Sequence, residues 1–315
     1  MDIVGFVILA VLLLMLISGG YVFFIACVRL KELQWLDESV LKKTPIGKYY
    51  DHIANADKWL KEHNAQDIYI TSKDGLKLHG LWVANPDAKG TVILVHGYRS
   101  TYLLDVSDAI PYYYGLGLNV LIPEHRAHGK SEGKFITFGV KESEDMLKWI
   151  NFHNSEYGEI PLVLGGVSMG ASTLLFLADR ELPENVKGIV ADCGFTSPAA
   201  IISKVFRSVI HLPATPSVWI ADLFARIFAG FSLYEKDTRK ILPNSRVPVL
   251  MIHGAEDGFV PCQMSRDGFG VCCEPKQLLV VDGADHGLSF LVDTNGYSSA
   301  VNMFVEKYIL NNGEK

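Results

Sequence analysis

Six short apolar runs recur along the chain, and stretches long enough for helices separate them. The runs lie at residues 91–97, 118–124, 161–167, 187–193, 247–254 and 277–283 and read TVILVHG, LNVLIPE, PLVLGGV, KGIVADC, VPVLMIHG and QLLVVDG. Strands that are buried on both faces and alternate with helices are typical of a parallel sheet. The pattern therefore predicts an α/β fold for residues 65–315, with a mostly parallel sheet flanked by helices.

Before these runs, residues 67–85 alternate apolar and polar side chains around Asp74 and Gly75. An Asp-Gly pair between two alternating segments is typical of the tight turn of a β-hairpin. We therefore expect an antiparallel hairpin that precedes the parallel strands.

The start of the chain has a different pattern. No charged residue occurs from Ile3 to Val28, and this run is longer than the roughly 20 residues that cross a bilayer. The basic residues follow the run rather than precede it: Arg29, Lys31, Lys42 and Lys43. We expect residues 1–28 to be a single transmembrane anchor, with the following domain on the cytoplasmic side.

A cleaved signal peptide is the main alternative for this run. Its apolar region would be shorter and a basic segment would precede it, whereas Asp2 is the charged residue before the run. The sequence FIAC at residues 24–27 resembles a lipoprotein cleavage site only faintly, since Ile25 is large. A buried core helix is a third interpretation, and the length of the run weighs against it.

Residues 29–64 form a polar, amphipathic stretch that Pro45 and Gly47 divide into two predicted helices. We interpret it as a helical juxtamembrane stalk that packs on the following domain.

The composition of the chain excludes some classes of function but does not identify one. Apolar residues make up 49% of the 315 residues, so a sizeable core can form. The net charge of -6, with no basic block, argues against nucleic acid as a partner. The five cysteines are odd in number and form no disulfide framework, which favours free thiols in a reducing compartment.

Ser168 follows the run PLVLGGV and stands in the sequence GGVSMGA. A nucleophile at a strand-to-helix turn must project above the sheet on a strained backbone, and bulky neighbours would clash there. Gly166 and Gly170 flank it at the spacing of a G-x-S-x-G nucleophile elbow. A glycine-rich turn with an incidental serine is the alternative, and the strand-elbow-helix context weighs against it.

A serine hydroxyl is a weak nucleophile without a base. Ligands bind at the carboxyl ends of parallel strands, and Asp257 and His286 follow the last two apolar runs in the order Ser, acid, His. Glu256 is the nearest competitor for the acid. Taken alone, Asp257 could be an ordinary loop carboxylate and His286 a surface histidine. Their occurrence together with Ser168, in this order, indicates a catalytic triad.

The same chemistry needs donors for the developing oxyanion. His96 and Gly97 end another buried strand, so the backbone N–H of Tyr98 would join that of Met169, the residue after the nucleophile. This assignment of an oxyanion hole depends on position rather than on side-chain identity.

The region from about Asp67 onward resembles an α/β-hydrolase fold serine hydrolase, and is similar to bacterial prolyl-oligopeptidase-like and serine aminopeptidase-like members. The resemblance lies in HGYRS, PEHRAHGKSEG, GGVSMGA, HGAEDGFVP and GADHG. It implies a Ser-Asp-His triad, no cofactor and acyl transfer to water. In PEHRAHGKSEG it implies that Arg126, His128, Gly129 and Ser131 mostly shape a turn.

Two other motifs are excluded. The GKS of that loop lacks the glycine of a Walker pattern, because Glu124 stands at its place. No H-E-x-x-H occurs, so we expect no catalytic metal.

An insertion at residues 199–240 precedes the acid and has apolar residues at helical spacing, broken at Pro213 and Pro216. In the family that the chain resembles, such insertions form a helical lid over the site. The aromatic residues suit an apolar acyl group or peptide side chain: Phe206, Trp219, Phe224, Phe228 and Phe231. Packing onto the sheet is the alternative for each of them.

Together these features predict a membrane-tethered serine hydrolase that acts on carboxylic esters. The expected substrate is a small-molecule or lipid-like ester. A serine peptidase or amidase is the first alternative, because the same triad cleaves amides. A membrane-anchored binding protein that keeps the fold without the activity is the alternative from another class.

Overall fold

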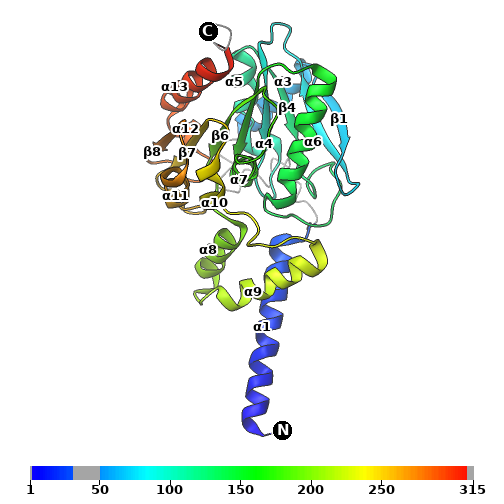
Figure 1. Cartoon of the computed structure of the whole chain (residues 1–315), viewed down its shortest axis with the longest axis vertical. Coiled ribbons are helices and arrows are strands. Elements are labelled where there is room, and N and C mark those ends of the chain that lie inside the picture. Colours follow the sequence, from blue (N-terminus) through cyan, green and yellow to red (C-terminus); the bar gives the residue numbers. More distant parts are fainter. Residues whose placement is uncertain (1, 31–49, 311–315) are drawn as a thin grey trace.

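The computed structural model describes residues 2–30 and 50–310, and its centre is an eight-stranded sheet (Figure 1). The order of the strands across the sheet is β1-β2-β4-β3-β5-β6-β7-β8. Their bounds are β1 Gln66–Thr71, β2 Lys77–Val83, β3 Gly90–Val95, β4 Leu118–Pro123, β5 Leu162–Val167, β6 Val186–Asp192, β7 Val249–Gly254 and β8 Lys276–Val281.

The strand directions confirm the predicted architecture. β1 and β2 form the antiparallel hairpin, and β2 also pairs with β4 in antiparallel register. All pairs from β4 to β8 are parallel. The six apolar runs are therefore the six strands whose carboxyl ends meet along one edge of the sheet, where the candidate site residues follow them.

Helices cover both faces of the sheet, and the strands supply side chains to both cores. Ile93 packs on the face covered by α6 and α7, whereas its neighbours Val92 and Leu94 face α5 and α13. The helices of the domain are α3 Tyr50–Glu62, α4 Tyr102–Asp105, α5 Ala109–Gly115, α6 Val140–Tyr157, α7 Met169–Leu175, α8 Pro198–Ile210, α9 Thr215–Phe224, α10 Thr238–Ile241, α11 Gln263–Val271, α12 Ser289–Val292 and α13 Thr294–Val305. Short π- and 3-10-helical turns cover Ala225–Ala229, Leu242–Asn244 and Glu306–Leu310.

One described part of the predicted stalk packs on the domain. The second of its two expected helices is α3, which contacts α4 and α5, and Trp59 meets the edge of the Tyr114 ring at 5.1 Å. The first expected helix lies outside the described residues.

The long apolar helix α1, Ile3–Cys27, projects from the base of the domain (Figure 1). It is long and apolar enough to cross a membrane, and its apolar stretch is almost entirely exposed. Its last part packs against α9, because Gly19 leaves room for the side chain of Ile220 and the hydroxyls of Ser18 and Ser217 lie 2.7 Å apart.

Candidate active site

Ser168 occupies the sharp turn between β5 and α7. Its backbone has φ 56° and ψ -116°, a region that non-glycine residues rarely adopt. A Cβ at position 166 would lie 2.6 Å from the carbonyl carbon of Gly170, and one at position 170 would collide with the carbonyl oxygen of Val95. Glycine at both positions is therefore what permits the close approach of these backbones.

A chain of hydrogen bonds connects the three residues that sequence order picked out. The Nε2 atom of His286 lies 2.9 Å from the Oγ of Ser168, and its Nδ1 lies 2.7 Å from Oδ2 of Asp257. Ser168 and Asp257 are buried and His286 is partly buried. The tertiary structure thus brings together residues that are up to 118 positions apart. Glu256, the competing acid, has no part in this hydrogen-bonded chain.

Asp257 is held as an ionised acceptor. Burial alone would raise its pKa, but hydrogen bonds from His253 and His286 outweigh burial and hold the pKa well below its usual range. Its other oxygen accepts from the N–H groups of Phe259 and Val260. A carboxylate fixed in this way orients the imidazole of His286 and stabilises its charged form.

His253 is a partner of this carboxylate that the sequence did not single out. Its Nε2 lies 3.1 Å from Oδ2 of Asp257 and 2.9 Å from the carbonyl oxygen of Val260. Both neighbours are acceptors, so Nε2 carries the proton, and the hydroxyl of Ser265 donates to Nδ1 at 2.6 Å. Its position at the end of a strand, four residues before the acid, was the available signal.

The segment after β3 reaches the nucleophile from the other side. A Cβ at position 97 would lie 3.1 Å from the Cβ of Ser168, so glycine permits this approach. The N–H of Gly97 donates to Asp105 at 2.5 Å, and the hydroxyl of Ser100 donates to the same carboxylate at 2.6 Å. Asp105 thereby holds the loop that carries Tyr98.

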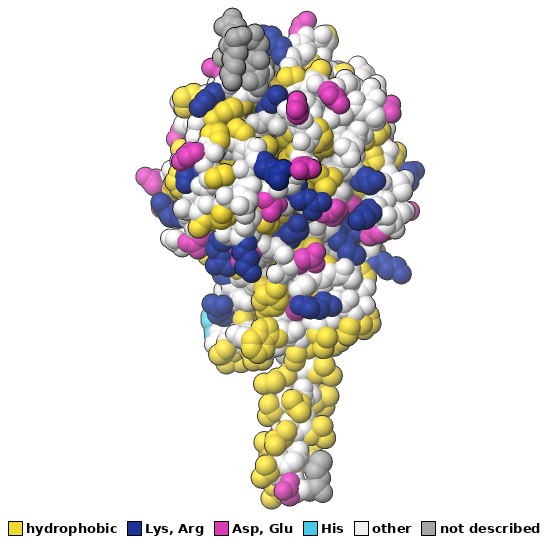
Figure 2. Space-filling model, viewed as in Figure 1, with side chains coloured by type: hydrophobic (Ala, Val, Ile, Leu, Met, Phe, Trp, Pro, Cys, Tyr) yellow, Lys and Arg dark blue, Asp and Glu magenta, His cyan; other side chains and the backbone are white. Residues whose placement is uncertain are grey.

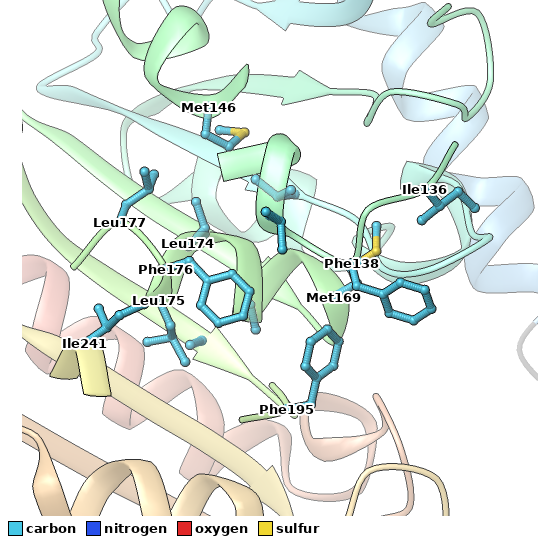
Figure 3. Packing of buried hydrophobic residues seen from close by; sticks show 14 of the residues in the cluster. Ile136, Phe138, Met146, Met169, Leu174, Leu175, Phe176, Leu177, Phe195 and Ile241 are labelled. Atoms are coloured by element: carbon cyan, nitrogen blue, oxygen red, sulfur yellow. The ribbon is translucent and has the colours of Figure 1, made fainter. Parts of the chain in front are cut away.

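Apolar packing supports the two backbone positions predicted for an oxyanion hole. Met169 is fully buried at the start of α7, in the same cluster as Phe138 and Phe195 (Figure 3). The ring of Tyr98 stacks on that of Phe138 at 4.9 Å, and Phe138 lies 6.3 Å from Phe195. The backbone at positions 98 and 169 is therefore attached to one rigid core.

A cavity of about 560 Å³ opens at Ser168 and His286. One wall is the segment from Gly97 to Tyr112, and the other is the segment from His286 to Leu291 with Tyr297. The lining is mainly apolar and accommodates a small organic molecule.

The predicted lid does not line this cavity. Residues 199–240 contain helices, as expected, but α9 packs against α1, and no residue of this stretch lines the cavity. From α8, Lys204 Nζ donates to the carbonyl oxygen of Gly258, next to the cavity-lining residue Phe259. The physical reason is that the apolar side of α9 packs against the apolar helix α1, and the sequence does not show which element α9 contacts.

Asp192 is a further residue that sequence reasoning missed. It ends β6, lines the cavity and accepts a 3.2 Å hydrogen bond from the hydroxyl of Ser289. Burial raises its pKa to about 6. The rule that selected Ser168 also applies to Asp192, because KGIVADC ends at the same edge of the sheet.

The thiol of Cys193 adds a third group beside Asp257 and His286. Potential ligand atoms of these three residues lie within 4.8 Å of one another. Burial raises the pKa of the thiol well above its ordinary value, and the other two side chains are hydrogen-bonded to each other.

The loop PEHRAHGKSEG connects several elements of the domain through its hydrogen bonds. Arg126 donates to Asp74 in the hairpin turn and to Asp145 on α6. His128 accepts from the N–H of Arg99 at 2.9 Å, so the loop also supports the segment beside Ser168. Gly129 and Ser131 offer carbonyl oxygens to Arg29 at 2.7 Å each.

The raised pKa of Asp192 predicts a pH-dependent stability. In the unfolded chain this carboxyl ionises near its ordinary pKa of about 3.9, so its burial destabilises the fold progressively as the pH rises through about 6. Asp192→Asn should therefore stabilise the protein at neutral pH by up to about 3 kcal/mol and have little effect near pH 4. Thermal unfolding in detergent at both pH values measures this difference.

Asp87→Asn is the matched control, because this exposed carboxylate stays in water. A gain from Asp192→Asn that is the same at both pH values would contradict the proposed ionisation.

Comparisons with known proteins find a family and several relatives that this chain resembles. The family described as serine aminopeptidase, S33, matches residues 86–218. The Bacillus subtilis protein YqkD is 28% identical over 241 residues, which cover 75% of this chain and 78% of that protein. Protein bem46 of Schizosaccharomyces pombe is 25% identical over 223 residues and covers 69% of each chain.

Solved structures show the same fold. An esterase of Pyrococcus furiosus, Pf2001, aligns with a TM-score of 0.63 and 25% identity over 79% of this chain and 96% of that one. The α/β hydrolase GrgF of a Penicillium species aligns with a TM-score of 0.62 at 16% identity over 78% of this chain and 99% of that one. On these observations, the chain has the α/β-hydrolase fold and is similar to the S33 serine aminopeptidases over residues 86–218.

Proposed function

We propose that the protein is a membrane-tethered serine hydrolase that cleaves carboxylic esters through an acyl-enzyme. The observation that carries the proposal is the 2.9 Å contact between His286 Nε2 and Ser168 Oγ at the mouth of the cavity. A nucleophile within hydrogen-bond reach of a base, which a third group orients, is the arrangement that activates a serine.

In the proposed reaction, Ser168 Oγ attacks the ester carbonyl carbon while His286 Nε2 accepts its proton. The tetrahedral intermediate collapses, the carbon–oxygen bond to the leaving alcohol breaks, and His286 returns the proton to that oxygen. Water then attacks the acyl-enzyme with His286 again as base, and the acid is released. Asp257 stabilises the imidazolium form in both halves of the reaction.

The backbone N–H groups of Tyr98 and Met169 are the proposed donors to the intermediate's oxyanion. Gly166 and Gly170 permit the elbow that presents Ser168 between these two groups. Preorganised donors of this kind lower the barrier because they need no rearrangement as the charge develops.

Two observations favour an ester over other acyl substrates. The cavity lining is mainly apolar, and the Pyrococcus furiosus relative that shares the fold is named an esterase. The match to a family of serine aminopeptidases keeps peptide or aminoacyl amide cleavage as the second candidate. Ester and amide cleavage require the same three side chains, so substrate measurements must separate the two.

The proposed tether is α1. It is long and apolar enough to span a bilayer, and almost all of its apolar stretch is exposed. The basic residues that follow it favour a cytoplasmic catalytic domain, since positively charged residues stay on that side of a membrane anchor.

A fluorophosphonate probe tests the nucleophile. The full-length protein in detergent should be labelled covalently, and Ser168→Ala should not be labelled. The kcat of Ser168→Ala for ester hydrolysis should fall by on the order of 10⁶-fold. His286→Ala should be similarly inactive, and Asp257→Asn less so. Labelling that persists in Ser168→Ala would reject this serine, and a folded wild type without labelling or hydrolysis would favour the binding-protein alternative.

A substrate panel tests the ester assignment. Each methylene buried in an apolar cavity contributes about 0.8 kcal/mol, so kcat/KM for p-nitrophenyl esters should rise with acyl length until the cavity is full. Aminoacyl p-nitroanilides measured beside them report on the peptidase alternative. Faster turnover of the anilides than of every ester would replace the ester proposal with that alternative.

A further inference from the structure

The part of α1 that is free of the domain is too short to cross a bilayer alone. Asp2 caps the start of the helix, and its side chain accepts from the N–H of Gly5 at 2.8 Å. Ser18 already contacts α9 through Ser217. At 1.5 Å per residue the helix rises only about 22 Å from Ile3 to Ser18, whereas the hydrocarbon core is about 30 Å thick. Any tilt of the helix would shorten this span further.

The surface of the domain at the level of α9 is apolar. Seven large hydrophobic side chains of the segment 209–228 are more than 45% exposed: Val209, Ile210, Leu212, Trp219, Leu223, Ile227 and Phe228. Figure 2 shows hydrophobic side chains at the base of the domain that continue into the exposed shaft of α1. Soluble monomers rarely expose a continuous apolar surface of this kind.

The charges of this segment suit the same environment. Asp222 is buried, and its carboxylate accepts from Arg226, from Ser232 and from the N–H of Leu233 at 2.6 Å. Figure 2 shows Lys and Arg side chains just above the hydrophobic base. Long basic side chains at such a boundary reach the lipid headgroups while their stems stay in apolar surroundings.

We propose that the segment 209–228, which contains the end of α8, all of α9 and most of the turn that follows, inserts into the same bilayer that α1 spans, so that hydrocarbon reaches the level of Phe23. This inference rests on the proposed tether. The occupant of the apolar surface is lipid, because the surface adjoins the part of α1 that must lie in hydrocarbon for the helix to span. Phe23 packs between Phe135 on the domain side and the rings of Phe224 and Phe228.

Tryptophan quenching by brominated lipid tests this depth. The full-length protein is reconstituted in phosphatidylcholine–phosphatidylglycerol vesicles whose acyl chains carry bromine, which quenches tryptophans in contact with hydrocarbon. Trp219, which is 63% exposed, should account for a quenched component that Trp219→Phe removes. Trp59→Phe is the matched control, since Trp59 stacks on His63 in α3, and this variant should keep that component.

Different results would contradict the insertion of α9 and the tethering by α1. Quenching that is unchanged in Trp219→Phe, or a dimer in which a second copy shields Trp219 from the lipid, would overturn the insertion of α9. Failure of the wild type to enter vesicles at all would instead overturn the tether.

A second inference concerns the end of α1, which contacts the segment beside the nucleophile. The last carbonyl groups of a helix have no partner within it. The hydroxyl of Tyr98 donates to the carbonyl oxygen of Ala26 at 2.8 Å, and Arg99 donates to those of Ile25 and Val28 at 2.6 and 2.9 Å. The two side chains that satisfy the end of the anchor therefore belong to the segment that lines the cavity.

Arg99 has a backbone that needs such support. Its φ of 51° is in the left-handed region, which costs a non-glycine residue roughly 1–2 kcal/mol. The N–H of Arg99 is held by His128, and its guanidinium is held by α1. We infer that the end of the anchor positions the peptide of Tyr98, and that Arg99 and the Tyr98 hydroxyl are positioning groups for the proposed oxyanion hole.

Kinetics of the full-length protein test this coupling. Tyr98→Phe keeps the stacked ring and removes the hydroxyl, and Arg99→Met removes both hydrogen bonds to α1. Because oxyanion contacts act in the transition state, kcat should fall by about tenfold or more in Arg99→Met, and less in Tyr98→Phe, with KM nearly unchanged. The rate of fluorophosphonate labelling should fall in parallel.

Arg29→Met is the matched control. The guanidinium of Arg29 also joins the end of α1 to the domain, and it donates to the carbonyl oxygens of Gly129 and Ser131. An equal loss of kcat in Arg29→Met, or a change in KM alone in Arg99→Met, would overturn the coupling. A wild type that neither hydrolyses substrate nor reacts with the probe would overturn the proposed function instead.

Discussion

The close approach of α7 to β3 and β5 is the constraint on which the site depends. Ser168 can take its strained backbone because Gly166 and Gly170 let the first turn of α7 lie against the ends of these strands. A larger residue at either position would push the helix away from the sheet and move the serine from His286. The energetic cost of the elbow is offset by the core beneath it, in which Met169 and the rest of α7 are fully enclosed.

Two buried carboxyl groups near this elbow, those of Asp257 and Asp192, have pKa values that are shifted in opposite directions. Asp257 has two imidazole partners and two backbone N–H donors, so it stays charged although it is buried. The side chain of Asp192 accepts a hydrogen bond from the hydroxyl of Ser289, and its pKa is raised. Burial therefore has opposite outcomes for neighbouring groups, because hydrogen bonds to the charged form decide which effect prevails.

The end of α1 contacts the segment beside Ser168 directly, so the proposed tether is joined to the site by hydrogen bonds and not by a flexible linker. Unsatisfied carbonyl groups are expensive where water is scarce, and the domain supplies their donors from the segment next to Ser168 and from the backbone of Ile136 at 2.7 Å. The anchor and the domain thus share one interface. In the proposed arrangement, a soluble fragment without α1 would expose this interface and differ from the native enzyme at its oxyanion donors.

The sequence by itself determined the strands, because runs of apolar residues indicate burial on both faces of a sheet. It also indicated that Ser168, Asp257 and His286 lie close together, because each follows a strand and the carboxyl ends of parallel strands meet at one edge. The sequence also identified Gly166 and Gly170, since a larger side chain at either position would clash with neighbouring backbone. The partner of α9 could not be identified in this way, because an apolar helical face packs equally well on a sheet, over a cavity or on another helix. Tertiary structure alone decided that α9 packs on α1 and that His253 contacts the carboxylate of Asp257. It also decided that the carbonyl groups at the end of α1 accept from Tyr98 and Arg99. The sequence could not show these contacts, because they depend on how the folded backbone brings the side chains together.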